Sequence, residues 1–259
     1  MNRTMASLIS LIVRWVGVFI DPRKIFSWRF LPRYLNHWFS YQTKSGKTLK
    51  FGDSYPCFSD WVRSTPYDPH YFYQGAWISR CLKKSSPTLH IDIGSSVLTV
   101  GVMSGYVQTI FVDYRPLNAK LSGLSSVGGS INKLPFADGA VRSLSCMHVI
   151  EHIGLGRYGD PLDPDGANKA IAELVRVMAP RGKLYLTTPV GRERVCFNAH
   201  RVFSPVDLPL MFKGLNVRSF AWVDDAGQFH AEASPEDAVD SEYACGFYEF
   251  EKLDAEVSS

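Results

Sequence analysis

Few cysteines occur in this 259-residue chain, and they are widely separated. The five cysteines lie at least 24 residues apart and form no Cys-x-x-Cys. This spacing argues against a structural zinc site, and the odd number favours a reducing compartment over a disulfide framework. Internal repeats and low-complexity segments are also absent, which excludes collagen-like, coiled-coil and disordered proteins. With 46% hydrophobic and 20% charged residues, the chain has the composition of a globular protein.

An apolar run long enough to span a bilayer is also missing. Residues 5–20 are apolar except for Ser7, Ser10, Arg14 and Gly17, which form one polar stripe on a helix. These sixteen residues make a helix of about 24 Å, shorter than the roughly 30 Å of hydrocarbon in a bilayer. No signal-peptide cleavage site follows the run. The pattern predicts an amphipathic helix lying in a membrane interface; a helix packed on its own domain and a short span remain open alternatives.

Charge is divided unevenly along the chain. Residues 1–50 hold nine Lys and Arg against one acid, whereas the remainder holds 19 Lys and Arg against 24 Asp and Glu. Aromatic side chains are mixed with the bases, as in a segment that sits among lipid headgroups: Trp28, Arg29, Arg33, Tyr34, Trp38 and Tyr41. We therefore expect residues 1–40 to form a basic arm that binds an anionic membrane surface rather than nucleic acid. The protein is then cytoplasmic, held peripherally on the inner face of the cytoplasmic membrane.

Short apolar runs alternate with helical patterns in the rest of the chain. Strands are predicted over 88–94, 106–112, 144–150, 183–188 and 244–250. Helices are predicted from His70 to before Pro87 and from Ala167 to Met178. This alternation predicts an α/β protein with a Rossmann-like, doubly wound and mostly parallel sheet. The expected domains are the arm (1–40), a helical lead-in (41–87), the sheet domain (88–252) and an acidic tail (253–259); the oligomeric state stays open.

Two acids end successive predicted strands. Asp92 opens the turn Asp-Ile-Gly-Ser-Ser, and Asp113 follows 21 residues later. An acid at the second position can bind both ribose hydroxyls of an adenosine cofactor, while Gly94 lets the backbone approach it. On these residues alone, two acids that merely cap turns are an equal alternative. A dinucleotide dehydrogenase is excluded, because Gly-x-Gly-x-x-Gly is absent after the first strand.

Three later segments narrow the choice of cofactor. Residues 134–138 read Leu-Pro-Phe-Ala-Asp, residues 145–152 read Ser-Cys-Met-His-Val-Ile-Glu-His, and residues 172–189 end in Leu-Tyr-Leu-Thr-Thr-Pro. Their order and spacing resemble the second half of a class I S-adenosylmethionine-dependent methyltransferase. The phrase over 148–166, with Phe-Asn-Ala-His-Arg at 197–201, resembles a narrower methyltransferase-like family whose members often accompany bacterial surface-polysaccharide genes. The resemblance covers residues 67–252.

The resemblance implies S-adenosylmethionine as the cofactor and assigns residues to it. Asp92, Gly94 and Ser95 correspond to the methionine end, Asp113 to the ribose, Leu134 to the adenine, and Met147 with His148 to the surroundings of the methyl group. Two positions depart from the usual pattern: Ser96 replaces a glycine of the turn, and Ser130 replaces an acid that can bind the adenine amino group. The first departure is expected to restrict backbone approach, and the second removes a hydrogen-bond acceptor.

Polar residues after the predicted strands over 144–150 and 183–188 are the candidates for chemistry. We expect His152 to act as the general base and His200 as a base or acceptor-binding group, because histidine titrates near neutral pH. Asp160, Asp163 and Arg201 are the expected acceptor-binding residues. No metal is expected; Glu151, His152 and Asp160 are the residues that could hold one.

Two other motifs are weaker interpretations of the same region. His148-x-x-Glu151-His152 spells an inverted zinc-protease motif, but a predicted strand precedes it and two glycines follow, so the required helix is not expected. Asp163-Pro164-Asp165 resembles the Asp-x-Asp of glycosyltransferases but does not end a hydrophobic strand. The favoured function is O-methylation of a sugar or glycolipid in cell-surface polysaccharide synthesis. The alternative is a non-catalytic methyltransferase-like protein that binds a partner at the membrane.

Overall fold

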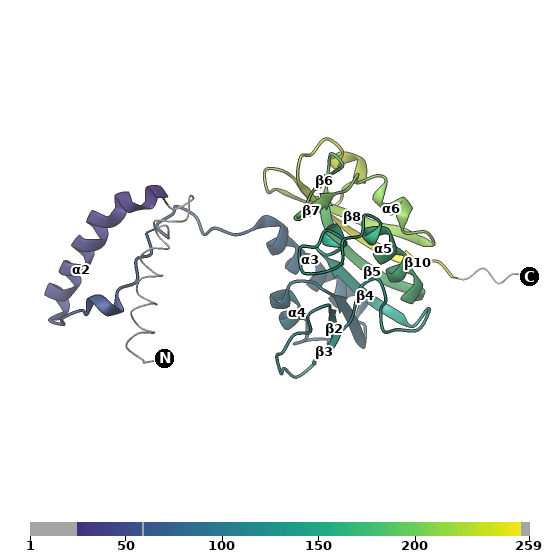
Figure 1. Cartoon of the computed structure of the whole chain (residues 1–259), viewed down its shortest axis with the longest axis horizontal. Coiled ribbons are helices and arrows are strands. Elements are labelled where there is room, and N and C mark those ends of the chain that lie inside the picture. The colour runs from purple at the N-terminus through teal and green to yellow at the C-terminus, as the bar shows by residue number, and fades with distance from the viewer. Residues whose placement is uncertain (1–24, 59, 255–259) are drawn as a thin grey trace, which may run out of the picture. The chain divides into compact units, whose positions relative to one another are not determined.

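The computed structural model describes residues 25–58 and 60–254, and it divides the chain into two compact units between Tyr67 and Asp68 (Figure 1). The predicted domain boundaries at residues 40 and 87 lie on either side of this division. The predicted amphipathic helix over residues 5–20 and most of the predicted acidic tail lie outside the described residues.

The first unit contains one long helix. The 3-10 helix η1 (Ile25–Phe30) leads into α2 (Leu31–Ser45), which ends at Gly46 with a φ of 65°; η2 (Phe51–Asp53) follows. None of the residues of α2 is buried, and large apolar side chains such as Leu35 and Phe39 are exposed along it. Among the described residues, no helix is both long and apolar enough to cross a membrane.

The second unit is built on an eight-stranded sheet with the order β3-β2-β1-β4-β5-β10-β8-β9. The parallel strands are β1 (Leu89–Ile93), β2 (Gln108–Asp113), β3 (Leu124–Gly128), β4 (Val141–Met147) and β5 (Met178–Val190). The antiparallel strands are β10 (Ala244–Lys252), β8 (Leu215–Val223) and β9 (Phe229–His230). A separate two-stranded ribbon joins β6 (Arg194–Cys196) to β7 (His200–Val202). The predicted α/β class with a mostly parallel sheet is confirmed.

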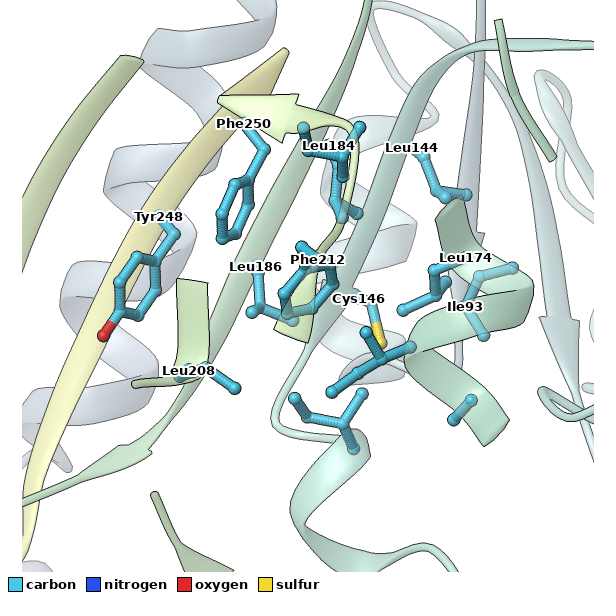
Figure 2. Close-up of a cluster of buried hydrophobic side chains, with 14 of the residues drawn as sticks. Ile93, Leu144, Cys146, Leu174, Leu184, Leu186, Leu208, Phe212, Tyr248 and Phe250 are labelled. Carbon is cyan, nitrogen blue, oxygen red and sulfur yellow. The ribbon is translucent and has the colours of Figure 1, made fainter. Parts of the chain in front are cut away.

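Helices cover both faces of the sheet. On one face, α3 (Pro69–Ser85) and α4 (Val97–Met103) contribute Ile78 and Val100 to a core with Phe111 and Tyr185 of the strands. On the other face, α5 (Gly166–Val177) and α6 (Leu208–Met211) pack into a larger core, in which Figure 2 shows Leu174 and Leu208 among side chains of β1, β4, β5 and β10. The 3-10 helix η4 (Pro235–Ala238) adds Ala238 to this second core. The sheet is thus doubly wound.

The fourth strand ends earlier than its sequence predicts. The apolar run to Ile150 suggests a strand over 144–150, whereas β4 ends at Met147 and the 3-10 helix η3 (Ile150–His152) follows. The physical reason is His148, whose φ of 56° turns the chain out of the strand direction. Ile150 is apolar because it is fully buried after this turn, not because it belongs to the strand.

A buried chain of polar side chains crosses β1 and β4. His90 Nδ1 lies 2.8 Å from Ser143 Oγ, and His90 Nε2 lies 2.8 Å from Ser145 Oγ. Ser145 in turn donates its hydroxyl proton to Asp92 Oδ2. Ser145 must therefore accept from Nε2–H, which leaves Nδ1 to accept from Ser143. Burial lowers the pKa of His90 to about 3, so the ring is neutral in the folded protein.

We expect His90 to make the fold sensitive to acid. Its pKa is lowered by folding, so its contribution to stability is present above the unfolded value of about 6.5 and is lost as the pH falls toward 3. Between pH 7 and pH 4 this contribution of His90 should fall by about 3 kcal/mol, which is measured as the difference between wild type and His90→Gln in urea unfolding at several pH values. His90→Gln should have a flatter pH dependence than wild type, whereas His37→Gln, which changes an exposed histidine, should not. Equal slopes for all three proteins would contradict a neutral buried His90.

Candidate functional site

The order in which the chain adds strands to the sheet reverses between β1 and β4. β2 and β3 lie on one side of this point, and β4 and β5 lie on the other. Ligands of open α/β sheets bind beyond the carboxyl ends of the strands at such a switch point. A cavity of about 140 Å³ lies there, lined by Ile93, Gly94, Val112, Asp113, Tyr114, Arg115, Gly129, Ile131, His148, Val149, His152, Ile153, Tyr158 and Asp160. We refer to it as the first cavity.

The turn after β1 requires a glycine and faces the acid at the end of β2. Gly94 has a φ of 65°, and its N–H donates to the carbonyl of Val112. A Cβ added to Gly94 would lie 3.3 Å from the side chain of Val149 and 3.5 Å from Asp113 Oδ2. Asp113 Oδ1 accepts from the N–H of Arg115 at 2.7 Å. The glycine therefore leaves open the space between the turn and the Asp113 carboxylate.

Asp92 and Ser95 tie this turn to the neighbouring strand. Asp92 is fully buried, and its Oδ1 accepts from the N–H of Ser95 at 3.1 Å. Burial raises the pKa of Asp92 to about 6, although its hydrogen bonds with Ser145 and Ser95 oppose the rise. The Ser95 hydroxyl accepts from the N–H of Met147 at 3.1 Å. Ser96, which replaces the expected glycine, has a φ of −56°, a conformation open to any residue, so the turn forms without that glycine.

A second, more polar cavity of about 470 Å³ adjoins the first one. It is lined by Asp68, His70, Tyr71, His148, Glu151, His152, Arg157, Asn198, Ala199, His200 and Tyr243. His148 and His152 line both cavities. A ligand in the first cavity can thus reach the contents of the second past these two rings.

The ring of His148 contacts a polar side chain through each of its two nitrogens. Its Nδ1 lies 2.9 Å from Glu151 Oε1 and its Nε2 lies 3.3 Å from Cys245 Sγ. Burial alone would lower the pKa of His148, but Cys245 and Glu151 together raise it well above its ordinary value. Glu151 is fully buried, and its other oxygen accepts from Thr188 Oγ1 at 3.2 Å. Although burial opposes it, the contact with His148 keeps the pKa of Glu151 below its ordinary value.

His152 is held in one tautomer. Its Nδ1 lies 2.6 Å from the carbonyl oxygen of Ala199, which can only accept, and 3.2 Å from Arg157 Nη1, which can only donate. The much shorter contact with the carbonyl favours the proton on Nδ1. Its Nε2 then has a free lone pair and lies 3.8 Å from Glu151 Oε1. Burial lowers the pKa of His152, which keeps the ring neutral near pH 7. His200 lies beside Tyr243, with ring centroids 4.9 Å apart, and burial lowers its pKa as well.

Several predicted site residues do not line either cavity. The side chain of Leu134 is buried in the larger core, and that of Met147 is buried in the core under α3 and α4. Asp163 pairs with Lys169 at 2.7 Å, and Arg201 donates to the carbonyl of Ile153 at 2.6 Å. Asp160 does line the first cavity, where its carboxylate accepts from the N–H of Gly154 at 2.8 Å.

Other residues that line the second cavity are not predicted from the sequence. His70 and Tyr71 lie at the start of α3, where the Asp68 carboxylate accepts from the N–H groups of both. The order Asp-Pro-His is a signal for the start of a helix, but no spacing in the sequence places this helix start near Tyr243 or Glu151. Only the packing of α3 beside β4 and β10 brings these residues to one place.

Two solved methyltransferase structures share this fold. The N-methyltransferase NodS from Bradyrhizobium japonicum WM9, in complex with S-adenosyl-L-homocysteine, matches with a TM-score of 0.50 at 14% identity, over 72% of this chain and 89% of that chain. A protein from Galdieria sulphuraria assigned as a sarcosine dimethylglycine methyltransferase matches with a TM-score of 0.51 at 14% identity, over 71% and 86%. The protein therefore has the fold of the class I S-adenosylmethionine-dependent methyltransferases.

At the level of sequence, residues 95–235 match the family described as "Caenorhabditis protein of unknown function, DUF268". The match spans more than half of the chain, which belongs to this family. The matched range begins in the glycine turn and includes His148, Glu151, His152 and His200. No curated protein matches the chain significantly in sequence.

Proposed function

We propose that the protein transfers a methyl group from S-adenosylmethionine to a hydroxyl oxygen of a sugar or glycolipid in cell-surface polysaccharide synthesis. The observation that carries the proposal is the Gly94 turn, which faces the Asp113 carboxylate beside a polar second cavity. The fold supports the class of reaction, since this sheet is shared with methyltransferases. The polysaccharide context rests on the family resemblance of residues 148–166 and 197–201.

The residues of the first cavity fit an adenosine cofactor. The Asp113 carboxylate can accept hydrogen bonds from two ribose hydroxyls, and the space that a Cβ on Gly94 would fill is free for the cofactor. Ile131 and Val149 offer apolar contacts for a base, in place of the buried Leu134. S-adenosylmethionine supplies the methyl group from its sulfonium when bound. We assign Asp113 and Gly94 to its binding.

The residues of the second cavity fit a hydroxyl acceptor. Its lining includes carboxylate, amide, guanidinium and imidazole groups, which can bind the several hydroxyls of a sugar. Positioning of the acceptor supplies much of the acceleration of a displacement reaction, and a general base adds to it. We assign the base to His152, because Ala199 fixes its proton on Nδ1 and leaves Nε2 free. His200, on the same cavity, binds the acceptor or takes over as base.

Calorimetric titration of the full-length chain tests the cofactor assignment. S-adenosylmethionine and S-adenosylhomocysteine should each bind with one site per chain. NAD also contains adenosine, but its pyrophosphate is usually bound by a Gly-x-Gly-x-x-Gly turn, which this chain lacks after its first strand. NAD should therefore bind much more weakly. An absence of heat at millimolar S-adenosylhomocysteine would contradict the proposed function.

We further propose that residues 1–40 hold the protein on an anionic membrane surface. Support comes from the basic composition and from the exposed side chain of Phe39 on α2. Phe39→Ser should weaken binding to anionic liposomes roughly thirtyfold in a flotation assay, because the lost aromatic side chain contributes about 2 kcal/mol when buried. Phe197→Ser, which removes an even more exposed phenylalanine from the second unit, is the matched control and should float like wild type. Flotation that is equal for both variants would contradict this role of α2.

A further inference from the structure

We propose that His70, His148 and Cys245 form a binding site for a divalent cation of the zinc type. The three residues come from the start of α3, from the turn after β4 and from β10. One ligand atom of each lies within 4.8 Å of the other two. Imidazole nitrogen and thiolate sulfur are the ligands that Zn²⁺ prefers in proteins. The proposal does not depend on methyl transfer, since it concerns only these side chains.

The distances are those of a site that needs little movement to close. In a tetrahedral site, Zn–N and Zn–S bonds of about 2.0 and 2.3 Å place neighbouring ligand atoms about 3.5 Å apart. The separation of His148 Nε2 and Cys245 Sγ is 3.3 Å, so one edge of the tetrahedron already exists. The rings of His70 and His148 are stacked, with centroids 5.7 Å apart and an angle of 10° between planes. A rotation of His70, which is half-buried at the end of a helix, can close the other two edges.

The surroundings of His148 are those of a metal-ligating histidine. Such histidines usually bind a carboxylate through the ring nitrogen that does not contact the metal, which fixes the orientation of the ring. Glu151 Oε1 lies 2.9 Å from His148 Nδ1, opposite the nitrogen that faces Cys245. The positive φ of His148 is a second constraint, since backbone strain at a non-glycine residue concentrates at functional sites.

The open coordination position would face the second cavity. His70 and His148 line this cavity, whereas Cys245 is buried behind them. Three protein ligands with a free fourth position are typical of catalytic zinc sites, where the cation lowers the pKa of a bound water or hydroxyl. The proposed site differs from the group Glu151, His152 and Asp160 considered from the sequence. His70, His148 and Cys245 lie too far apart in the chain for their spacing in the sequence to indicate a metal site.

Titration with Co²⁺ tests the site without any assay of activity. The full-length chain is reduced, freed of metal by a chelator, and titrated with Co²⁺, which should bind with one equivalent per chain. The expected spectrum has a thiolate-to-cobalt charge-transfer band and the intense visible bands of tetrahedral cobalt. Addition of Zn²⁺ should remove these bands by displacement.

Variants then separate this site from adventitious binding. Cys245→Ser should remove the charge-transfer band, His70→Ala should weaken binding at least tenfold, and Glu151→Gln should weaken it tenfold to a hundredfold. Cys196→Ser, outside the site, should bind like wild type. Circular dichroism checks folding. If Cys245→Ser is unfolded, the half-buried His70 at the start of α3 provides the deciding variant, His70→Ala. The proposal would be overturned if folded wild type did not bind Co²⁺. It would also be overturned if the charge-transfer band persisted in Cys245→Ser, or if His70→Ala bound Co²⁺ with unchanged affinity.

Discussion

Asp113→Ala is expected to weaken binding of S-adenosylhomocysteine about a hundredfold. The carboxylate can accept two charge-assisted hydrogen bonds from the ribose, and their loss should cost about 2 to 3 kcal/mol. The site is formed in advance, because Asp113 Oδ1 already accepts from the N–H of Arg115 and Oδ2 faces the Gly94 turn. Calorimetric titration of wild type and variant measures the effect directly.

Two further variants show whether this effect comes from the ribose contact. Asp113→Asn keeps one acceptor oxygen and should lose about tenfold in affinity, between wild type and Asp113→Ala. Asp207→Ala removes an acid next to α6, away from the first cavity, and should leave affinity unchanged. If Asp113→Ala binds as well as wild type, the adenosine is not held at the end of β2.

His152→Ala is expected to lower turnover about a hundredfold while affinity for S-adenosylhomocysteine stays within about twofold. A general base contributes on the order of 10²- to 10⁴-fold, and His152 Nε2 is free to accept a proton because Nδ1 donates to Ala199. Turnover is measured as transfer of a labelled methyl group to hydroxyl compounds. His200→Ala should lower turnover at least tenfold through its contact with the acceptor.

Controls distinguish a base from a residue that shapes the cavity. His230→Ala removes a histidine outside both cavities and should leave turnover and cofactor affinity unchanged. Full turnover in both His152→Ala and His200→Ala would refute the assignment of the base. Loss of cofactor affinity in both would instead show that these histidines support the cofactor site and do not act as the base.

The sequence predicts four of the five parallel strands, because these four are largely buried and form short apolar runs, whereas β3, β8 and β9 are not predicted. The strand over residues 88–94 is observed as Leu89–Ile93, and the helix over 167–178 as Gly166–Val177. The error at Ile150 has a local cause, since the positive φ of His148 is invisible in a pattern of apolar residues. Edge strands such as Leu124–Gly128 carry few buried residues and so leave little signal.

The site is predicted only in part, for a reason of packing. Asp92, Gly94 and Asp113 lie at the carboxyl ends of neighbouring parallel strands, which meet at one edge of the sheet. A correct prediction of these strands therefore also predicts that the three residues lie close together. Leu134 and Met147 match cofactor-binding positions of the methyltransferase pattern in sequence, but their side chains are buried in the two cores. His70 and Cys245 reach His148 through contacts between α3, β4 and β10, and such contacts between distant segments cannot be read from residue spacing.

Transfer of a radiolabelled methyl group from S-adenosylmethionine is the most direct measurement of the proposed function. The full-length protein is incubated with the labelled cofactor and a panel of free sugars and glycolipids, and the products are separated and treated with alkali. The predicted result is an alkali-stable label on a hydroxyl oxygen of at least one acceptor, which depends on both Asp113 and His152. Binding of the cofactor without transfer of label to any hydroxyl acceptor would contradict the account and favour a non-catalytic binding protein with a methyltransferase fold.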